Sequence, residues 1–162
     1  MVRWADQVPT GGRVLDVASG NGRHARYFAT RGYQVEAMDR DPAMLAGLAG
    51  IPGIRTRCGD LENGPWPYEG ECFAGVVVTN YLYRPLFPLL LAAVAQEGVL
   101  IYETFAAGNE RYGRPSNPDF LLNPGELLEA VRGRLRVIAY EDVFVAMPRP
   151  AVVQRICAAN TR

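Results

Sequence analysis

Short apolar segments alternate along the chain with stretches in which hydrophobic and polar residues recur at helical spacing. The segment Ala74–Thr79 contains three consecutive valines and is expected to be buried on both faces of a sheet. Strands that alternate with helices are typical of a mostly parallel sheet. The segments predicted to be strands are Arg13–Val17, Tyr33–Met38, Gly53–Cys58, Ala74–Thr79, Val99–Thr104, Leu135–Phe144 and Ala151–Ala158.

Capping signals place helices between these strands. The predicted helices are Gly22–Thr30, a helix that begins at Pro42 after the N-cap Asp41, Pro85–Ala95, and a helix that runs from an N-cap at Asn123 to about Arg132. The last two strands are separated only by Ala146–Pro150, so they are expected to pair as an antiparallel hairpin. The predicted fold class is α/β: a Rossmann-like, three-layer α/β/α sandwich with a seven-stranded, mostly parallel sheet and a C-terminal antiparallel hairpin.

One polar stretch, residues 106–123, is long for a loop in a compact domain and is predicted to be a lid or binding loop. Its apolar run Phe120–Leu122 is expected to tether the loop to the body of the domain. Arg111 and Arg114 in this loop are candidates for clamping a carboxylate or phosphate of a substrate.

Composition narrows the class of protein. The 162 residues, 49% hydrophobic and 21% charged, are typical of a single globular domain that spans residues 1–162. A net charge of zero disfavours nucleic acid and membrane surfaces as partners. The three cysteines are scattered and there is one histidine, so neither a disulfide framework nor a metal site is expected. With no signal-like N-terminus, the protein is expected to be cytoplasmic.

The stretch "DVASGNGRHA" after the first predicted strand carries the Gly20-x-Gly22-x-x-Ala25 spacing of dinucleotide-binding loops. However, Asp16 lies beside this loop, and two like charges at about 4 Å repel by about 4 kcal/mol at an effective dielectric constant near 20. A pyrophosphate is therefore disfavoured there, whereas a cofactor that carries an ammonium and a sulfonium is favoured.

Further polar residues follow the other predicted strands and are expected to surround one crevice, because ligands bind at the carboxyl ends of parallel strands. They are Asp39, Asp60, Asn80 with Tyr81, and Glu103. A carboxylate after the second strand suits the ribose of either a NAD-type or a SAM-type cofactor. For Asp60 an Asx turn explains the residue as well as function does. Together these residues favour S-adenosylmethionine (SAM) over NAD.

The segments "VLDVASGNGRHARYFATRGYQVEAMDRDP", "CGDLE" and "FAGVVVTNYLYRP" resemble a class I SAM-dependent methyltransferase, and the first is similar to the tellurite-resistance methyltransferase group. The resemblance implies that Asp16 and the 20–22 backbone hold the methionine part of SAM, Asp39 the ribose, and Asp60 the adenine amine. S-adenosylhomocysteine (SAH) would be the product. The implied cofactor-binding residues are Asp16, Gly20, Asn21, Gly22, Asp39, Arg40, Asp60, Leu61 and Asn80.

Only about a dozen residues precede the first predicted strand, where such enzymes usually carry a helical cover over the cofactor. Either the 106–123 loop takes that role or the start is truncated relative to the relatives. Ser19 also stands where many relatives have Cys or Gly.

The expected reaction is in-line methyl transfer to a small-molecule acceptor, in which a base is needed only if the acceptor is protonated. The exit of the fourth strand reads "TNYLYRP" and lacks the motif of DNA amino-methylating enzymes. The candidates for catalysis are Tyr81, His24 and Glu103, and those for substrate binding are Tyr83, Arg111 and Arg114. Two alternatives stay open: a SAM-binding module without transferase activity, and an NAD(P)-binding oxidoreductase.

Overall fold

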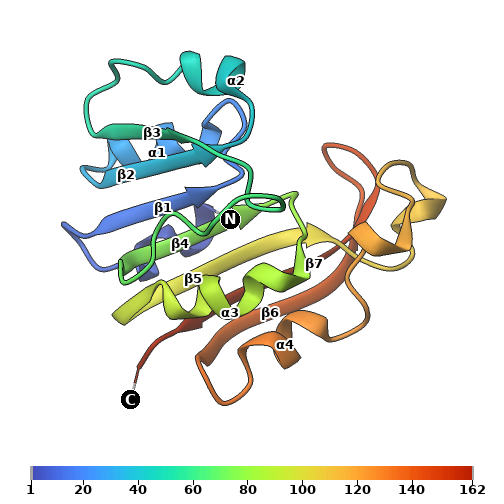
Figure 1. Ribbon diagram of the computed structural model, residues 1–162. Helices are drawn as coiled ribbons and strands as arrows, with labels where there is room; N and C mark the ends of the chain where they lie inside the picture. Colours follow the sequence, from blue (N-terminus) through green and yellow to red (C-terminus); the bar gives the residue numbers. More distant parts are fainter. Residues whose placement is uncertain (1, 162) are drawn as a thin grey trace.

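Seven strands form one sheet in the order β3-β2-β1-β4-β5-β7-β6 in the computed structural model, which describes residues 2–161 (Figure 1). The strands are β1 Arg13–Val17, β2 Gln34–Asp39, β3 Ile54–Cys58, β4 Phe73–Thr79, β5 Val94–Phe105, β6 Arg136–Val145 and β7 Ala151–Ala159. The α-helices are α1 Arg23–Thr30, α2 Pro42–Ala46, α3 Phe87–Ala92 and α4 Glu126–Val131. The 3₁₀ helices are η1 Val2–Gln7, η2 Arg84–Leu86, η3 Asn109–Arg111 and η4 Pro118–Phe120.

Helices cover both faces of the sheet, with α3 and α4 on one face and α1 on the other (Figure 1). Two hydrophobic clusters fill the layers between them. The consecutive valines of β4 divide between these clusters: Val76 and Val78 belong to the cluster under α3 and α4, and Val77 to the cluster under α1. The predicted three-layer sandwich and the burial of this strand on both faces are therefore confirmed.

The strand order reverses at β1, which pairs in parallel with β2 on one side and with β4 on the other. Strands β1 to β5 run parallel, β6 and β7 form the predicted antiparallel hairpin, and β7 also pairs antiparallel with β5. Loops that leave the carboxyl ends of β1 and β4 therefore border a switch point, where open α/β sheets bind ligands.

Several helix boundaries were predicted wrongly. Helix α3 begins at Phe87 instead of Pro85, because residues Arg84–Leu86 form the 3₁₀ helix η2. Helix α3 ends at Ala92 instead of Ala95, because Val94 already pairs with Phe73 of the neighbouring strand. The N-cap of α4 is Gly125 and not Asn123, since the chain enters this helix at φ +74°, a conformation that glycine adopts without strain. The 3₁₀ helix η1 was not predicted.

The loop 106–123 packs on the body of the domain. Ala106 forms a parallel bridge with Leu122, and Leu121 and Leu122 are buried. The side chain of Asn109 donates to the carbonyl of Pro115 at 3.0 Å and accepts from the Val152 amide at 3.2 Å. Two leucines therefore provide the predicted apolar tether, whereas Phe120 does not share in it, because that residue is 50% exposed.

None of the helices within residues 2–161 has both the length and the hydropathy needed to cross a lipid bilayer.

Candidate functional site

The loop after β1 is shaped by residues with positive φ. Ala18, Gly20 and Gly22 have φ of 52°, 56° and 75°, and Gly22 is the N-cap of α1. A Cβ atom at Gly22 would lie 2.4 Å from a methyl group of Leu48, so only glycine fits this position without a shift. The loop is also bonded to the next strand, because the amide of Ser19 donates to the carbonyl of Met38 at 2.9 Å.

Asp16 lies beneath this loop with its side chain fully buried. Its Oδ2 atom accepts from the amide of Ala25 at 2.9 Å, which joins β1 to the first turn of α1. Its Oδ1 atom has no hydrogen-bond partner among residues 2–161, and neither has the buried hydroxyl of Ser19. Burial raises the pKa of Asp16 to about 7. A buried carboxylate that lacks a partner is costly unless a donor or cation satisfies it.

Asp39 stands at the end of β2 and faces the same loop. Its Oδ2 atom accepts from the amide of Gly20 at 2.7 Å, and its Oδ1 atom accepts from the amide of Asp41 at 2.9 Å. Each carboxylate oxygen keeps a further lone pair, so the group can still accept two hydroxyl protons.

Asp60 follows β3 and caps its own turn. Its Oδ1 atom accepts from the amides of Glu62 and Asn63 at 2.9 and 3.3 Å, and its Oδ2 atom accepts from the side chain of Asn63 at 2.9 Å. The Asn63 amide and the Glu62 backbone amide hold the pKa of this carboxyl below its usual range. The Asx-turn alternative therefore describes part of what Asp60 does, and one lone pair on Oδ2 is left for a ligand.

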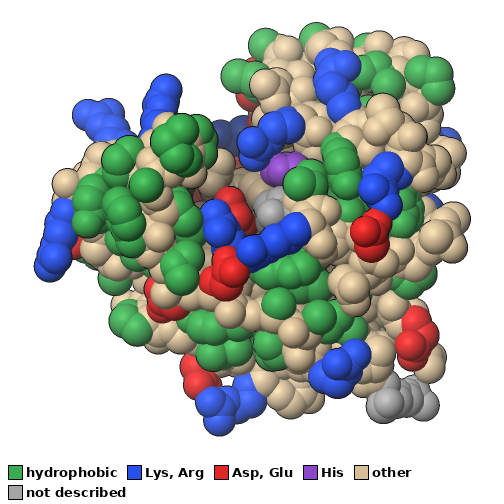
Figure 2. Space-filling model, turned by 180° about the vertical axis from the view of Figure 1, so that it is seen from behind, with side chains coloured by type: hydrophobic (Ala, Val, Ile, Leu, Met, Phe, Trp, Pro, Cys, Tyr) green, Lys and Arg blue, Asp and Glu red, His purple; other side chains and the backbone are tan. Residues whose placement is uncertain are grey.

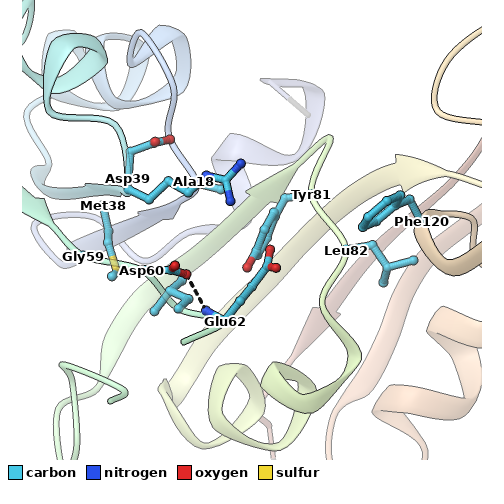
Figure 3. Close-up of a pocket in the computed structure, with 11 residues that line it drawn as sticks. Ala18, Met38, Asp39, Gly59, Asp60, Glu62, Tyr81, Leu82 and Phe120 are labelled. Carbon is cyan, nitrogen blue, oxygen red and sulfur yellow. Dashed lines mark hydrogen bonds between the residues drawn. The ribbon is translucent and has the colours of Figure 1, made fainter. Parts of the chain in front are cut away.

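A cavity of about 360 Å³ opens between these strand ends (Figure 3). The predicted residues Asp39, Arg40, Asp60 and Leu61 all line it. The remaining walls come from Ala18, Met38, Gly59, Glu62, Tyr81, Leu82 and Phe120. This volume is within the usual range for small-molecule sites, and its mixture of apolar walls with a few carboxylates is typical of them.

Asn80 and Tyr81 leave the end of β4 in a strained turn. Asn80 has φ of 53°, and its amide donates to the carbonyl of Glu103 on β5 at 2.9 Å. The hydroxyl of Tyr102 donates to the carbonyl of Tyr81 at 2.8 Å. Burial and the neighbouring Glu62 carboxylate raise the pKa of Tyr81, so its hydroxyl stays protonated at neutral pH.

His24 and Glu103 lie together on the other side of the β4 exit. His24 is 7% exposed, and its Nδ1 atom is 3.3 Å from the hydroxyl of Thr79. Burial, with a smaller effect from the Arg23 charge, lowers the pKa of His24 to about 4. Glu103 is ion-paired with Arg155, its cross-strand neighbour on β7. His24 is therefore neutral at physiological pH.

Two further cavities border these residues. One of about 470 Å³ is lined by His24 and Tyr27, and the other of about 580 Å³ by Asn80 and Arg114. Arg23, Glu103 and Arg155 line both. Arginine and acidic side chains gather around the histidine on this face (Figure 2).

The predicted site residues therefore divide between two places. Tyr81 lies in the 360 Å³ cavity with the cofactor candidates and is separate from His24 and Glu103, which share a cavity. The hydroxyl of Tyr83 donates to the carbonyl of Glu62 at 3.3 Å, and neither Tyr83 nor Arg111 lines any of the three cavities. Gly20, Asn21 and Gly22 shape the loop without lining a cavity.

Several lining residues were missed from the sequence. Arg23 adjoins the glycine loop, so its position could have indicated a role. Arg155 could be found only from the register of β5 with β7, which pairs it with Glu103. Nothing in the local sequence distinguishes Glu62 or Arg149. No cluster of His, Cys, Asp and Glu within the described part of the chain is arranged to hold a metal ion.

These features suit SAM on chemical grounds. The unpartnered Oδ1 atom of Asp16 lies where an anionic pyrophosphate would be repelled, and it could accept from an ammonium group. Asp39, with open lone pairs on both oxygens, could accept from the two hydroxyls of a ribose.

Comparison with known proteins gives the family. Residues 14–96, half of the chain, match the methyltransferase domain family. The chain is 30% identical over 112 residues to the protein-L-isoaspartate O-methyltransferase of Chlorobaculum tepidum, an alignment that covers 65% of this chain and 50% of that protein.

Solved structures share the fold. TehB from Haemophilus influenzae superposes with a TM-score of 0.80 at 18% identity, over 98% of this chain and 61% of that chain. An S-adenosylmethionine-dependent methyltransferase from Mesorhizobium loti superposes with a TM-score of 0.74 at 19% identity, over 98% and 96% of the two chains. This chain thus spans half the length of the Chlorobaculum enzyme and 61% of the TehB chain. Family match and fold lead to one assignment: the chain belongs to the methyltransferase domain family, as a class I, SAM-dependent member with the fold of the TehB group.

Proposed function

We propose that this protein transfers a methyl group from SAM to a small-molecule acceptor by in-line displacement. The observation that carries the proposal is the buried Asp16 carboxylate with its unpartnered Oδ1 atom, beside a glycine loop that is bonded to Asp39. When bound, the cofactor supplies an activated methyl group on a sulfonium. The protein contributes alignment of the acceptor and exclusion of water.

The proposed cofactor roles combine the first cavity with Asp16 and residues 20–22 of the glycine loop, which line none of the three cavities. Asp16 and the backbone at 20–22 would bind the amino-acid part, Asp39 the ribose hydroxyls, and Asp60 with Leu61 the adenine. Arg40 lines the same cavity, and Asn80 would contribute through its backbone at the border with the other cavities.

An anionic acceptor fits the 580 Å³ cavity best. Arg23, Arg114 and Arg149 line it from three different segments, and none of them has a carboxylate partner among residues 2–161. The one carboxylate in its wall, Glu103, is already paired with Arg155. Arginine binds carboxylate and phosphate groups through two parallel hydrogen bonds.

His24 is the residue proposed to accept a proton from an acceptor that is protonated in solution. In the tautomer with the proton on Nδ1, the imidazole donates to the hydroxyl of Thr79 and leaves Nε2 open. Glu103 lines both the 470 Å³ cavity of His24 and the 580 Å³ acceptor cavity, and its fixed carboxylate would orient an acceptor that reaches from one into the other. Tyr81 lines the cofactor cavity. Because its hydroxyl keeps its proton, we propose that Tyr81 forms a wall of this cavity and does not act as a base.

Methyl transfer from radiolabelled SAM to a panel of small acceptors tests this proposal. Matched pairs such as 4-mercaptobenzoate and 4-mercaptobenzamide test the charge preference, and protein and RNA serve as alternative acceptors. The expected result is transfer to the acid in preference to its amide, and a loss of that preference in Arg114→Gln. SAM binding without transfer to any acceptor would instead support a binding module.

A further inference from the structure

The 580 Å³ cavity has apolar residues in its wall besides its arginines. Tyr112 lines it from the 106–123 loop, and Met147 with Pro148 lines it from the turn between β6 and β7. Tyr112 is 49% exposed and Met147 is 79% exposed, so the protein itself leaves much of both residues uncovered. Uncovered apolar surface in the wall of a cavity favours a ligand with an apolar part.

The ring of Tyr112 is held by contacts on two sides. It packs against the ring of Phe144 on β6, with centroids 4.9 Å apart and planes inclined by 43°. The amide of Tyr112 donates to the carbonyl of the buried Asn109 at 2.8 Å, and the side chain of Asn109 accepts from the Val152 amide on β7. The loop and the β6–β7 turn lie side by side beyond the end of β5 (Figure 1). Because the protein itself orders the ring, less entropy is lost when a ligand contacts it.

Each of the two segments places an apolar side chain and an arginine two residues apart. Arg114 follows Tyr112 in the loop, and Arg149 follows Met147 in the turn. Two residues span at most about 7 Å between Cα atoms. All four side chains line the same cavity, so one small ligand can contact an apolar residue and an arginine together.

The cavity adjoins the cofactor cavity at the exit of β4. Asn80 lines the 580 Å³ cavity, and the next residue, Tyr81, lines the 360 Å³ cavity. An acceptor in the larger cavity can therefore direct its reacting group toward the cofactor near Asn80. Its remaining parts would then lie against the loop and the turn, where the apolar residues and the arginines are.

We propose that the acceptor is an aryl acid, whose ring lies against Tyr112 and whose carboxylate binds Arg114 and Arg149. The inference rests on the proposed function and names the substrate class for the same cavity. Aromatic pairs are favourable in tilted and offset geometries, and a methionine thioether makes favourable contacts with the edge of a ring. Tyr112 is thus the residue that determines specificity for the apolar part of the acceptor, while the arginines bind its acid.

NMR titration of the SAH-saturated protein with small acids tests the class, whichever atom is methylated. The probes are propionate, 3-phenylpropionate, its amide and 3-cyclohexylpropionate. The phenyl acid should bind about tenfold more tightly than propionate, because its ring is removed from water, and also more tightly than the amide. The cyclohexyl acid should bind more weakly than the phenyl acid, because it lacks an aromatic face.

Substitutions of Tyr112 assign the preference to its ring. Tyr112→Ala should bind the phenyl acid about tenfold more weakly and leave the affinity for propionate unchanged, whereas Tyr112→Phe should keep the wild-type preference. Arg114→Gln should weaken binding of both acids. Leu89→Ala is the control, because Leu89 is exposed on α3 and lines none of the three cavities. It should bind every probe as the wild type does.

Three results would overturn the inference. They are equal affinities of the wild type for the phenyl acid and propionate, a cyclohexyl acid bound at least as tightly as the phenyl acid, and a Tyr112→Ala variant that loses affinity for both acids equally. Each of them leaves the proposed methyl transfer standing, provided that SAH binds and an acid is methylated. A wild-type protein that binds no SAH would instead refute the proposed function, so the two failures are distinguishable.

Discussion

The carboxylate of Asp39 accepts a hydrogen bond from the backbone amide of Gly20 at 2.7 Å, so the end of β2 fixes the glycine loop that follows β1. One side chain thus organises the loop and offers open lone pairs to a ligand. The two parts of the proposed cofactor site, which are 19 residues apart in the sequence, are coupled through this bond.

This coupling predicts different outcomes for two substitutions of Asp39. Asp39→Asn keeps an acceptor for Gly20 but loses the charge, so SAH binding should weaken by about 2 kcal/mol, roughly thirtyfold in Kd. Asp39→Ala also frees the loop and should lower the melting temperature as well. Calorimetry and thermal unfolding check both effects, with Asp142→Asn on β6 as the control. Equal melting temperatures for the Asn and Ala variants would contradict the coupling.

Because Asp16 is buried, the folded protein should lose stability as the pH rises. Burial raises its pKa from 3.8 to about 7, so the folded protein holds this proton to a higher pH than the unfolded chain does. Its contribution to stability is therefore largest below pH 3.8 and is lost as the pH rises to about 7, an effect of about 4 kcal/mol at most. In urea unfolding, the stability of Asp16→Asn should not fall between pH 3.8 and about pH 7 as the stability of the wild type does. A variant less stable than the wild type at about pH 8 would contradict the assignment.

The same carboxyl should release a proton when the cofactor binds. A cation beside the unpartnered Oδ1 atom stabilises the charged form of Asp16, so SAM affinity should rise with pH from about 6 to about 8. Calorimetry near neutral pH in phosphate and in Tris should give different binding heats, from which the proton release follows. Identical heats in the two buffers would show that Asp16 does not change its protonation.

The buried His24 imidazole should give the stability a pH dependence opposite in sign to that of Asp16. Burial lowers its pKa from 6.5 to about 4, so the unfolded chain takes up this proton first and stability is lost as the pH falls from 6.5 toward 4. His24→Asn should therefore retain stability in acid better than the wild type does. In methyl-transfer assays, kcat should show no ionisation of histidine near pH 6.5. Such an ionisation, absent from His24→Asn, would contradict a neutral imidazole.

Gly22 and Gly20 should differ in their tolerance of alanine. Both have positive φ, which costs an alanine about 1 kcal/mol. A Cβ at Gly22 would also lie 2.4 Å from Leu48, whereas nothing lies within 4 Å of one at Gly20. Overpacking adds about 1–3 kcal/mol, so Gly22→Ala should be the less stable variant in urea unfolding. Equal losses for the two variants would show that Leu48 moves aside.

Much of the cofactor half could be predicted from local sequence, because strand ends and turns are encoded nearby. Arg13–Val17 was predicted residue for residue, and the aspartates after β2 and β3 do line one cavity. Asp60 shows the limit of such reasoning, since the same residue caps its turn and faces the cavity.

The rest of the candidate site depends on contacts between segments that are distant in the sequence. Arg155 reaches Glu103 across 52 residues through strand register, and Arg84 reaches the 106–123 loop across 35 residues or more. Phe120 was expected in the tether because it adjoins two leucines, yet the extended backbone at Leu121 follows a 3₁₀ turn that leaves the ring exposed. The local sequence pattern does not determine which way such side chains point.

The most direct test of the central claim is calorimetric titration of the wild-type protein with SAM, SAH and NADH. We expect SAM and SAH to bind in the micromolar range and NADH not to bind, because a buried carboxylate lies beside the glycine loop. Binding of NADH without binding of SAM or SAH would contradict the argument from the acidic strand ends.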